Sequence, residues 1–303
     1  MLPIVYHEGY VVPLPEGHRF PMPKFGMIHD LLCAEGITSC DDSHRPELPG
    51  REAVELVHQR RYVDAFSSGA LEARALRRIG LPWSEALVER TFRAVGGTIL
   101  TARLALEHGV ACNSAGGTHH AHPGFGSGFC ILNDLAIAAR LLLEEGAVRR
   151  VLIVDLDVHQ GDGTAVALRE RPELFTFSMH CGSNFPFRKA ESDLDVALPD
   201  HLGDREYLTE LASYLPDLLD DVKPDLLLYD AGVDVYRGDR LGRLDLTLAG
   251  IYKRDRYVLQ EAEIREIPVA AVIGGGYDRD LDSLSSRHAT VHRTAAELRE
   301  EKC

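Results

Sequence analysis

The sequence lacks the features that would place the protein in a membrane or outside the cell. No apolar run approaches the ~20 residues that a membrane-spanning helix needs. The N-terminal segment has no basic stretch followed by an apolar core, so we expect no signal peptide. The cysteines form no C-x-x-C pair and no regular framework, which is typical of thiols in a reducing compartment. They are Cys33, Cys40, Cys112, Cys130, Cys181 and Cys303. We therefore expect a cytoplasmic protein without membrane partners.

Positive charge is scarce relative to negative charge. The chain has 33 Lys and Arg against 47 Asp and Glu, a formal net charge of −14. A surface of this sign would repel nucleic acid, so we expect no nucleic-acid partner. A cationic substrate would be attracted weakly, although net charge does not locate the site. We found no internal repeat, low-complexity tract or linker, so we expect residues 1–303 to form one domain.

Short aliphatic runs alternate with amphipathic segments along the chain. The runs predict strands at residues 4–6, 110–112, 151–155, 174–178, 226–230 and 269–273. The amphipathic segments predict helices at 83–108, 134–145, 204–221, 248–263 and 280–298, with shorter helical pieces between 26 and 80. We expect Pro216 to kink or break its helix. This alternation predicts an α/β fold with three α/β/α layers and a central, mostly parallel sheet.

The stretch VLIVDLDVHQGDGT, residues 151–164, is the most informative part of the chain. After the apolar strand, polar groups alternate, and this spacing places Asp157 and His159 on one side of an extended segment. A carboxylate and an imidazole on a common face can form part of a divalent-metal site, because zinc accepts both oxygen and nitrogen ligands. Taken alone, the motif could equally cap the following helix or line a polar turn.

Polar clusters follow five of the predicted strands. They are His119 with His120, residues 155–162, residues 178–180, Asp234 and Tyr277. In open α/β sheets the ligand site lies outside the carboxyl ends of the strands. The coincidence therefore predicts one active site at that edge.

The residue types in these clusters suit metal-assisted amide hydrolysis. Asp157, His159 and Asp234 would supply three ligands and leave open positions, as in catalytic zinc sites. The adjacent His119 and His120 offer a base for water and an acid for the leaving amine.

Neighbouring polar residues could support this chemistry. Asp155 and Asp162 are natural hydrogen-bond partners for the two imidazoles. The Tyr277 hydroxyl could donate to a developing oxyanion, whereas the alternative is a tyrosine packed at a strand end.

Other polar residues carry less information. The glycines in residues 113–133 do not sit in a βαβ frame, which disfavours a dinucleotide loop. His288 and His292 lie four residues apart on the last helix, where we expect a solvated surface. His7, His18 and Lys24 also attract notice, but a lone histidine near a terminus is more often a surface residue.

Four motifs occur in a fixed order: GGTHHAHPGFGSGFC, DLDVHQGDG, DAGVD and GGGY. Together they resemble the signatures of the histone deacetylase superfamily, which has the arginase-deacetylase fold. The likeness covers about residues 62–277. The segments SMHCGSNFPFRKAESDLDVALPDHLGD and GDRLGRL look most like the class IV branch and its prokaryotic relatives.

The resemblance implies a role for each matching residue. Asp157, His159 and Asp234 match the zinc ligands, with iron as the alternative metal. His120 with Asp162 matches the general base and acid, and His119 with Asp155 matches the neighbouring pair that stabilises the transition state. Tyr277 matches the tyrosine that polarises the acyl carbonyl.

The resemblance also implies a substrate tunnel and a structural potassium ion. Phe129 and Phe185 match the tunnel walls, and Gly128 the carbonyl that contacts the substrate amide. Potassium would be held by carbonyls of Asp155, Asp157, His159 and Met179 and by side-chain oxygens of Asp155 and Ser178. Two departures are Thr118, where many members carry a bulkier aromatic residue, and the lack of an alignable acidic rim residue.

The expected substrate is an acylated lysine in a protein or peptide, or a small acylated amine, and the motifs do not choose between them. An acetylpolyamine deacetylase is therefore an open alternative. An arginase-type ureohydrolase would need further Asp ligands, typically in a late D-x-D, where the chain offers only Asp234. A non-catalytic acyl-lysine binding module would need neither the His pair nor Tyr277. Acyl-chain length and oligomeric state are not encoded in these motifs.

Overall fold

The computed structural model describes residues 1–301. A seven-stranded sheet in the order β1-β2-β7-β6-β3-β4-β5 forms its centre, and each neighbouring pair is parallel. The strands are β1 Ile4–Val5, β2 Val110–Asn113, β3 Val151–Asp155, β4 Leu174–Cys181, β5 Leu194–Leu198, β6 Leu226–Asp230 and β7 Val269–Val272. The predicted parallel α/β sheet is thus confirmed.

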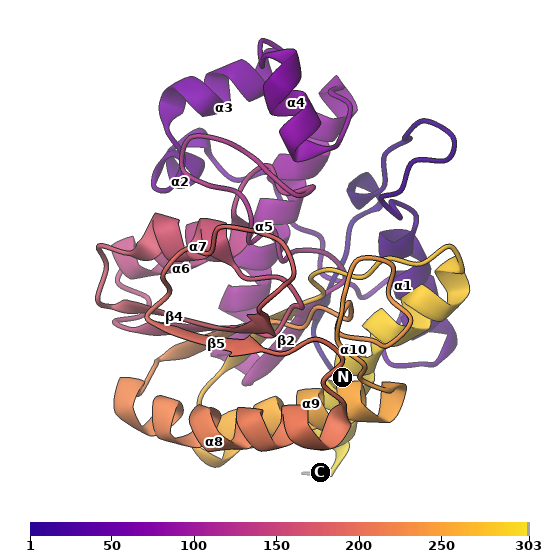
Figure 1. Ribbon diagram of the computed structural model, residues 1–303, viewed down its shortest axis with the longest axis vertical. Helices are drawn as coiled ribbons and strands as arrows, with labels where there is room; N and C mark the ends of the chain where they lie inside the picture. Colours follow the sequence, from indigo (N-terminus) through magenta and orange to yellow (C-terminus); the bar gives the residue numbers. More distant parts are fainter. Residues whose placement is uncertain (302–303) are drawn as a thin grey trace.

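Helices cover both faces of this sheet, which gives the predicted three layers. Figure 1 shows α6 and α7 on one side and α8 and α9 on the other, with α2, α3 and α4 grouped beyond the first layer. The helices are η1 Glu8–Tyr10, α1 Lys24–Ala34, α2 Arg51–Glu55, α3 Arg60–Ser67, α4 Ala73–Ile79, α5 Glu85–His108, α6 Asp134–Glu144, α7 Asp162–Leu168, α8 Asp204–Val222, α9 Leu248–Ile264 and α10 Leu281–Glu300.

The register of the central strands brings polar residues together at their carboxyl ends. All five residues of β3 are buried, because β4 and β6 flank the strand and helices cover both faces. Asp155, the last residue of β3, pairs with Ser178 on β4 and with Asp230 on β6. Three polar side chains therefore stand in a row where the strands end.

Asn133 links the start of α6 to the loop that carries the His pair. Its side-chain oxygen accepts from the backbone N–H of Ala136 at 2.9 Å, which caps the helix. Its side-chain nitrogen donates to the carbonyls of His119 and Ala121, at 3.4 and 3.2 Å. The cap thus holds the glycine-rich segment against the sheet.

Several expectations about elements were wrong. Strand β5 was not predicted, and Pro216 does not break α8, which runs from Asp204 to Val222. His288 and His292 are buried rather than solvated, because α10 packs against both α1 and α9. A helix whose sequence looks polar is therefore part of the interior.

The cysteines are not all free thiols. Cys33 and Cys40 form a disulfide, whereas Cys112, Cys130 and Cys181 are free and buried. Cys303 lies outside the described residues. In residues 1–301, no helix combines the length and apolar character needed to cross a bilayer.

Candidate functional site

Asp157, His159 and Asp234 converge at the carboxyl edge of the sheet. Their candidate ligand atoms all lie within 4.8 Å of one another. The Nδ1 atom of His159 is 3.0 Å from Asp157 Oδ1 and 3.1 Å from Asp234 Oδ2. All three residues are buried, and Asp234 Oδ2 makes no hydrogen bond within the described chain. Two buried carboxylates around one imidazole have the donor types and spacing of a divalent-metal site.

Electrostatics also favour a cation here. Burial lowers the pKa of His159, but Asp157 and Asp234 outweigh it and raise that pKa to about 10. Burial and the neighbouring Asp157 raise the pKa of Asp234. The site therefore holds more negative charge than the imidazole alone can balance, and a bound divalent cation would relieve this excess.

Backbone hydrogen bonds fix the two carboxylates in place. Asp157 Oδ2 accepts from the N–H of Gly275 at 2.7 Å, and Asp234 Oδ1 accepts from the N–H of Val158 at 2.9 Å. Because donor and acceptor lie after different strands, these bonds tie the segments that follow β3, β6 and β7 to one another. The ligand geometry is thus set before any ion binds.

Arg254 on α9 donates hydrogen bonds to the backbone of the segments that follow β3 and β6. Its guanidinium is fully buried and donates to the carbonyls of Leu156, Gly232 and Ala231 at 3.2, 2.6 and 3.2 Å. Its charge is paired with Asp255 at 2.9 Å. Sequence analysis missed this residue, since an Arg-Asp pair within an amphipathic helix is usually solvent-exposed.

The two adjacent histidines have different electrostatic environments. His120 Nδ1 lies 2.6 Å from Asp162 Oδ1, and His119 Nδ1 lies 2.7 Å from Asp155 Oδ2, as predicted from the sequence. Burial and the neighbouring His119 lower the pKa of His120 to about 4, so this ring is neutral at neutral pH. For His119, burial is outweighed by Asp155 and Asp157, which raise the pKa well above its usual value. One ring can accept a proton, and the other is a cation.

Asp162 also has a second partner, which sequence analysis overlooked. Its Oδ2 atom lies 3.0 Å from Nε2 of His122, two residues after His120. The two imidazoles, as hydrogen-bond partners, hold the pKa of this carboxyl well below its usual range despite burial. Asp162 is therefore ionised and keeps His120 oriented.

Thr118 anchors the loop that precedes the His pair. Its Oγ1 donates to the carbonyl of Leu132 at 2.5 Å and contacts the buried carboxylate of Asp134. Asp134 also accepts from the backbone N–H of Gly117 at 3.1 Å. Thr118 therefore fixes this loop through hydrogen bonds, whereas an aromatic residue at the same position would fix it through packing.

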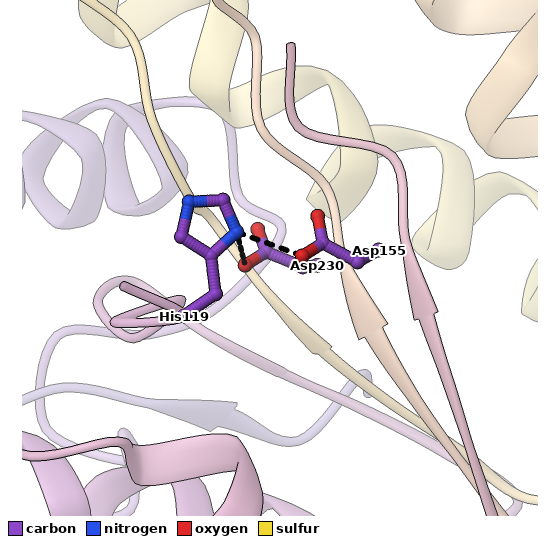
Figure 2. A group of neighbouring side chains, drawn as sticks. All are labelled: His119, Asp155 and Asp230. Atoms are coloured by element: carbon purple, nitrogen blue, oxygen red, sulfur yellow. Dashed lines mark hydrogen bonds and ion pairs between the residues drawn. The ribbon is translucent and has the colours of Figure 1, made fainter. Parts of the chain in front are cut away.

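A second acidic group lies beside the first and was not recognised from the sequence. Figure 2 shows His119, Asp155 and Asp230 turned toward one another, and their candidate ligand atoms also lie within 4.8 Å. The His119–Asp155 contact is a 2.7 Å hydrogen bond, and a cation bonded to both atoms would have to replace its proton. Both carboxyl oxygens of Asp230 lack a hydrogen-bond partner within residues 1–301. Burial, and then Asp155, raise the pKa of Asp230 well above its usual value.

Tyr277 is held by its backbone rather than by its hydroxyl. Its N–H donates to Asp239 Oδ2 at 2.6 Å, and its carbonyl accepts from the N–H of Arg240 at 3.1 Å. Burial and the nearby Asp234 raise the pKa of the phenol well above 10, so it remains a proton-bearing donor. The 238–242 turn, which sequence analysis used only as a family marker, therefore positions Tyr277.

A cavity of about 500 Å³ opens onto these groups. It is lined by the His pair, two of the three candidate ligands, Tyr277 and the predicted tunnel residues, namely His119, His120, Asp157, His159, Tyr277, Gly128, Phe129 and Phe185. Gly128 has a positive φ of 53°, and a Cβ there would lie 2.8 Å from the His120 ring. A larger cavity, of about 720 Å³, is lined by residues such as Val110, Val269 and Leu298 and by none of the residues predicted for the site.

The remaining predicted residues lie behind the cavity wall. Ser178 and Met179 are buried on β4, next to the end of β3, and the Ser178 hydroxyl lies 3.0 Å from His180 Nδ1. Asp155, Asp162 and Asp234 also do not line the cavity but contact residues that do. Every predicted residue is thus at or beside the same edge of the sheet.

Comparison with known proteins places these observations in context. Residues 18–293 match the family model described as "Histone deacetylase domain". An uncharacterized protein of Picosynechococcus sp. is 57% identical over 98% of this chain and 99% of its own length. Histone deacetylase 2 of Arabidopsis thaliana is 29% identical over 90% of this chain and 74% of its own. The acetoin utilization protein AcuC of Staphylococcus aureus is 29% identical over 86% and 72%, respectively.

A solved structure shares the fold. The crystal structure of the HDA15 HD domain matches with a TM-score of 0.82 over 98% of this chain and 88% of that chain, at 21% sequence identity.

Proposed function

The chain belongs to the histone deacetylase family, and on this premise we propose that it is a zinc-dependent deacetylase. It would remove an acetyl or longer acyl group from an acyl-lysine side chain or a related amine. The observation that carries the proposal is the convergence of three metal-type ligands, a neutral histidine and a protonated phenol around one cavity. We further propose that residues 1–303 act as a single catalytic domain.

In the proposed site, Asp157, His159 and Asp234 hold the metal. When bound, a zinc ion lowers the pKa of water and polarises the acyl carbonyl, and ferrous iron could serve in its place. The backbone N–H groups of Gly275 and Val158 orient the two carboxylates, and Arg254 fixes the segments that carry them. A cation bound to both Asp157 and His159 would replace the proton that Nδ1 of His159 shares with Asp157.

His120 is the proposed base and acid. Its Nδ1–H donates to Asp162, which leaves Nε2 free to accept the proton of the attacking water. The same nitrogen then delivers that proton to the departing amine. The adjacent cationic His119, paired with Asp155, stabilises the negative charge that develops on the substrate oxygen.

The proposed role of Tyr277 is to donate its hydroxyl proton in a hydrogen bond to the same oxygen. Gly128, Phe129 and Phe185 would enclose the acyl-lysine side chain and exclude water, which strengthens the electrostatic contacts. Phe185 already packs edge-on against the His120 ring, with the ring centroids 4.8 Å apart.

We also propose a structural potassium ion beneath the site. Its carbonyl ligands would come from Asp155, Asp157, His159 and Met179, with side-chain oxygens from Asp155 and Ser178. The pairing of Asp155 with Ser178 across β3 and β4 supports this assignment. A non-catalytic acyl-lysine binding role is disfavoured, because binding alone requires neither a neutral His120 nor Tyr277.

Two variants with opposite metal phenotypes test the proposal. We expect His120→Ala to abolish hydrolysis of an acetyl-lysine peptide while retaining one metal per chain after dialysis, because His120 lies outside the ligand set. We expect Asp234→Ala to lose the metal as well as the activity. His108→Ala, an exposed histidine at the end of α5, is the control and should match the wild type. Turnover by His120→Ala, or full metal content in Asp234→Ala, would contradict the proposed roles.

A further inference from the structure

The residues that line the cavity differ in their balance of charge from the molecule as a whole. The chain carries a net charge of −14, yet among residues 1–301 the only acidic residue that lines the cavity is Asp157, one of the proposed metal ligands. Five cationic residues also line it. They are Arg19, Lys24, Arg78, Arg90 and Arg243. Positive charge thus lines the cavity in front of the acidic residues that form the candidate metal site.

Three of these cations lie at the rim of the cavity. Lys24 and Arg90 are buried within the protein, whereas Arg19, Arg78 and Arg243 are exposed to solvent. Arg243 is partly neutralised by Asp200, at 3.5 Å. Arg19 and Arg78 form no ion pair with any carboxylate in residues 1–301.

Aromatic rings hold the two unpaired guanidinium groups in position. Arg19 lies 5.0 Å above the ring of Phe129, which lines the cavity and packs 5.7 Å from the Tyr277 ring. Arg78 lies 4.5 Å above the ring of Phe125. A guanidinium stacked on a ring keeps its N–H groups free to bind an anion. Ordered, unpaired arginines are therefore available where a substrate must enter.

This arrangement selects among acylated amines. A carboxylate beside the scissile amide could bind a rim arginine through two parallel hydrogen bonds. A polyamine or a lysine-rich segment would instead bring positive charge against the rim, and like charges at short range repel. The rim therefore opposes the weak attraction for cations that the net charge alone would give.

We propose, on the premise that the protein is a deacylase, that Arg19 and Arg78 form an anion-recognising rim. The preferred substrate is then an acyl-lysine that carries carboxylates close to its acylated side chain. The carboxylates can belong to acidic residues that flank the lysine in a peptide, or to a small acylated amino acid. Acylated polyamines are poor substrates.

Matched substrates test the proposal in the wild-type, metal-loaded protein. Three peptides would carry the same acetyl-lysine flanked by Asp, Asn or Lys, and kcat/KM would be measured at low ionic strength. We expect the order Asp, Asn, Lys, with roughly 5- to 20-fold between the first and the last, because each exposed ion pair contributes about two- to fivefold. The ratio should fall toward one in about 1 M salt, where the screening length is only ~3 Å.

Small substrates identify the source of the carboxylate. Free Nε-acetyl-lysine would be compared with its C-terminal amide and with N-acetylputrescine. Preference for the acid over the amide, with little preference among the peptides, assigns the rim to a small acylated amino acid. Preference among the peptides assigns it to acidic protein segments. Efficient hydrolysis of N-acetylputrescine, comparable to that of the Asp peptide, would overturn the proposal.

Variants connect the preference to the two arginines. Arg19→Gln and Arg78→Gln should each reduce the Asp-to-Lys ratio by about two- to fivefold, mainly through a higher KM for the Asp peptide. Arg19→Lys, which keeps the charge, should retain the preference, and Arg77→Gln is the control, because Arg77 is on the same helix but does not line the cavity. An unchanged ratio in the Arg19→Gln, Arg78→Gln double variant would refute the rim. Failure to hydrolyse any substrate would instead refute the deacylase function.

Discussion

At the scale of single residues, the site depends on chemically similar groups that differ in protonation. His119 and His120 are adjacent, with ring centroids 4.1 Å apart, yet their pKa values shift in opposite directions. His119 faces Asp155 and Asp157, whereas His120 has only Asp162 as a close anionic partner and a cationic neighbour. Each ring is thus suited to one task, charge stabilisation or proton transfer.

Asp230 differs from the other acidic residues of the site because it has a negative neighbour but no hydrogen bond. Burial and Asp155 raise its pKa against the lowering effect of His119, so the carboxyl binds a proton more readily in the folded protein than in the unfolded chain. A group whose pKa is higher in the folded state binds more protons there, so its contribution to stability falls as the pH rises above the unfolded value. At pH 7, Asp230 therefore destabilises the fold.

Asp230→Asn tests this directly. Asparagine resembles the protonated acid, and its amide can donate to Asp155, so we expect the free energy of unfolding at pH 7 to rise by about 1 kcal/mol or more. The gain should shrink as the pH falls and disappear below about pH 3, where the aspartate of the unfolded chain is also protonated. Urea titrations at the two pH values measure both.

The opposite result would indicate a different role for Asp230. Loss of stability at pH 7, together with loss of a second metal equivalent, would mean that a cation binds among His119, Asp155 and Asp230. The Asp234→Ala variant gives the reference value for loss of the first equivalent.

At the scale of elements, Arg254 relates the segments after β3 and β6 to each other. Its carbonyl contacts lie at Leu156, one residue before Asp157, and at Gly232, two residues before Asp234. The guanidinium thus links α9 to both ligand-bearing segments by hydrogen bonds, a set of contacts that we call the Arg254 brace. Asp255 balances its charge inside the protein.

Removing the Arg254 brace should weaken metal binding even in a variant whose free energy of unfolding is largely restored. Arg254→Met leaves Asp255 as an unpaired buried charge, so we expect a loss of about 3–5 kcal/mol in the free energy of unfolding. The Arg254→Met, Asp255→Asn double variant should recover much of that loss. It should nevertheless bind metal about 10- to 100-fold more weakly, because the ligand segments have lost their support. Competition with a chelator measures the affinity, and wild-type affinity in the double variant would show that the brace is purely structural.

Elements were predictable from sequence where one local pattern determined them. The apolar run of β3 and the capped start of α6 each carry a local signal, and both were found within a residue. Strand β5 lies at the edge of the sheet, and its alternate residues are exposed. Its sequence therefore resembles that of a loop. His292 could not be placed, because burial of a polar helix face depends on α1 and α9, which lie far away in sequence.

The same reasoning applies to the site. Residues that follow the end of a strand and carry reactive side chains, such as Asp157 and Tyr277, were placed at the site from spacing and family resemblance. Supporting residues such as Asp239 and Arg254 were missed, because their function lies in backbone contacts across 20 or more residues of sequence. No local pattern records such contacts.

At the scale of the whole molecule, buried titratable groups divide into two sets with opposite effects on acid stability. Burial is the main cause that lowers the pKa of four histidines to about 4, namely His58, His120, His180 and His292. Burial also raises the pKa of acidic groups. For Asp239, burial and then the neighbouring Asp234 raise the pKa to about 7. The histidines make stability rise with pH between about 4 and 6.5, whereas the raised carboxyls make it fall. The net pH profile therefore conceals both contributions.

A single histidine far from the metal ligands can separate them. The Nε2 atom of His58 accepts from the backbone N–H of Asn133 at 2.8 Å, and glutamine can replace this acceptor without gaining a charge. In the unfolded wild type, His58 takes up a proton below pH 6.5, which favours unfolding, whereas the buried ring resists protonation until about pH 4. His58→Gln should therefore gain about 2 kcal/mol relative to the wild type between pH 7 and pH 4.5. Paired urea titrations at equal metal content measure this difference, and a difference that does not change with pH would mean that His58 takes up a proton as readily in the folded protein as in the unfolded chain.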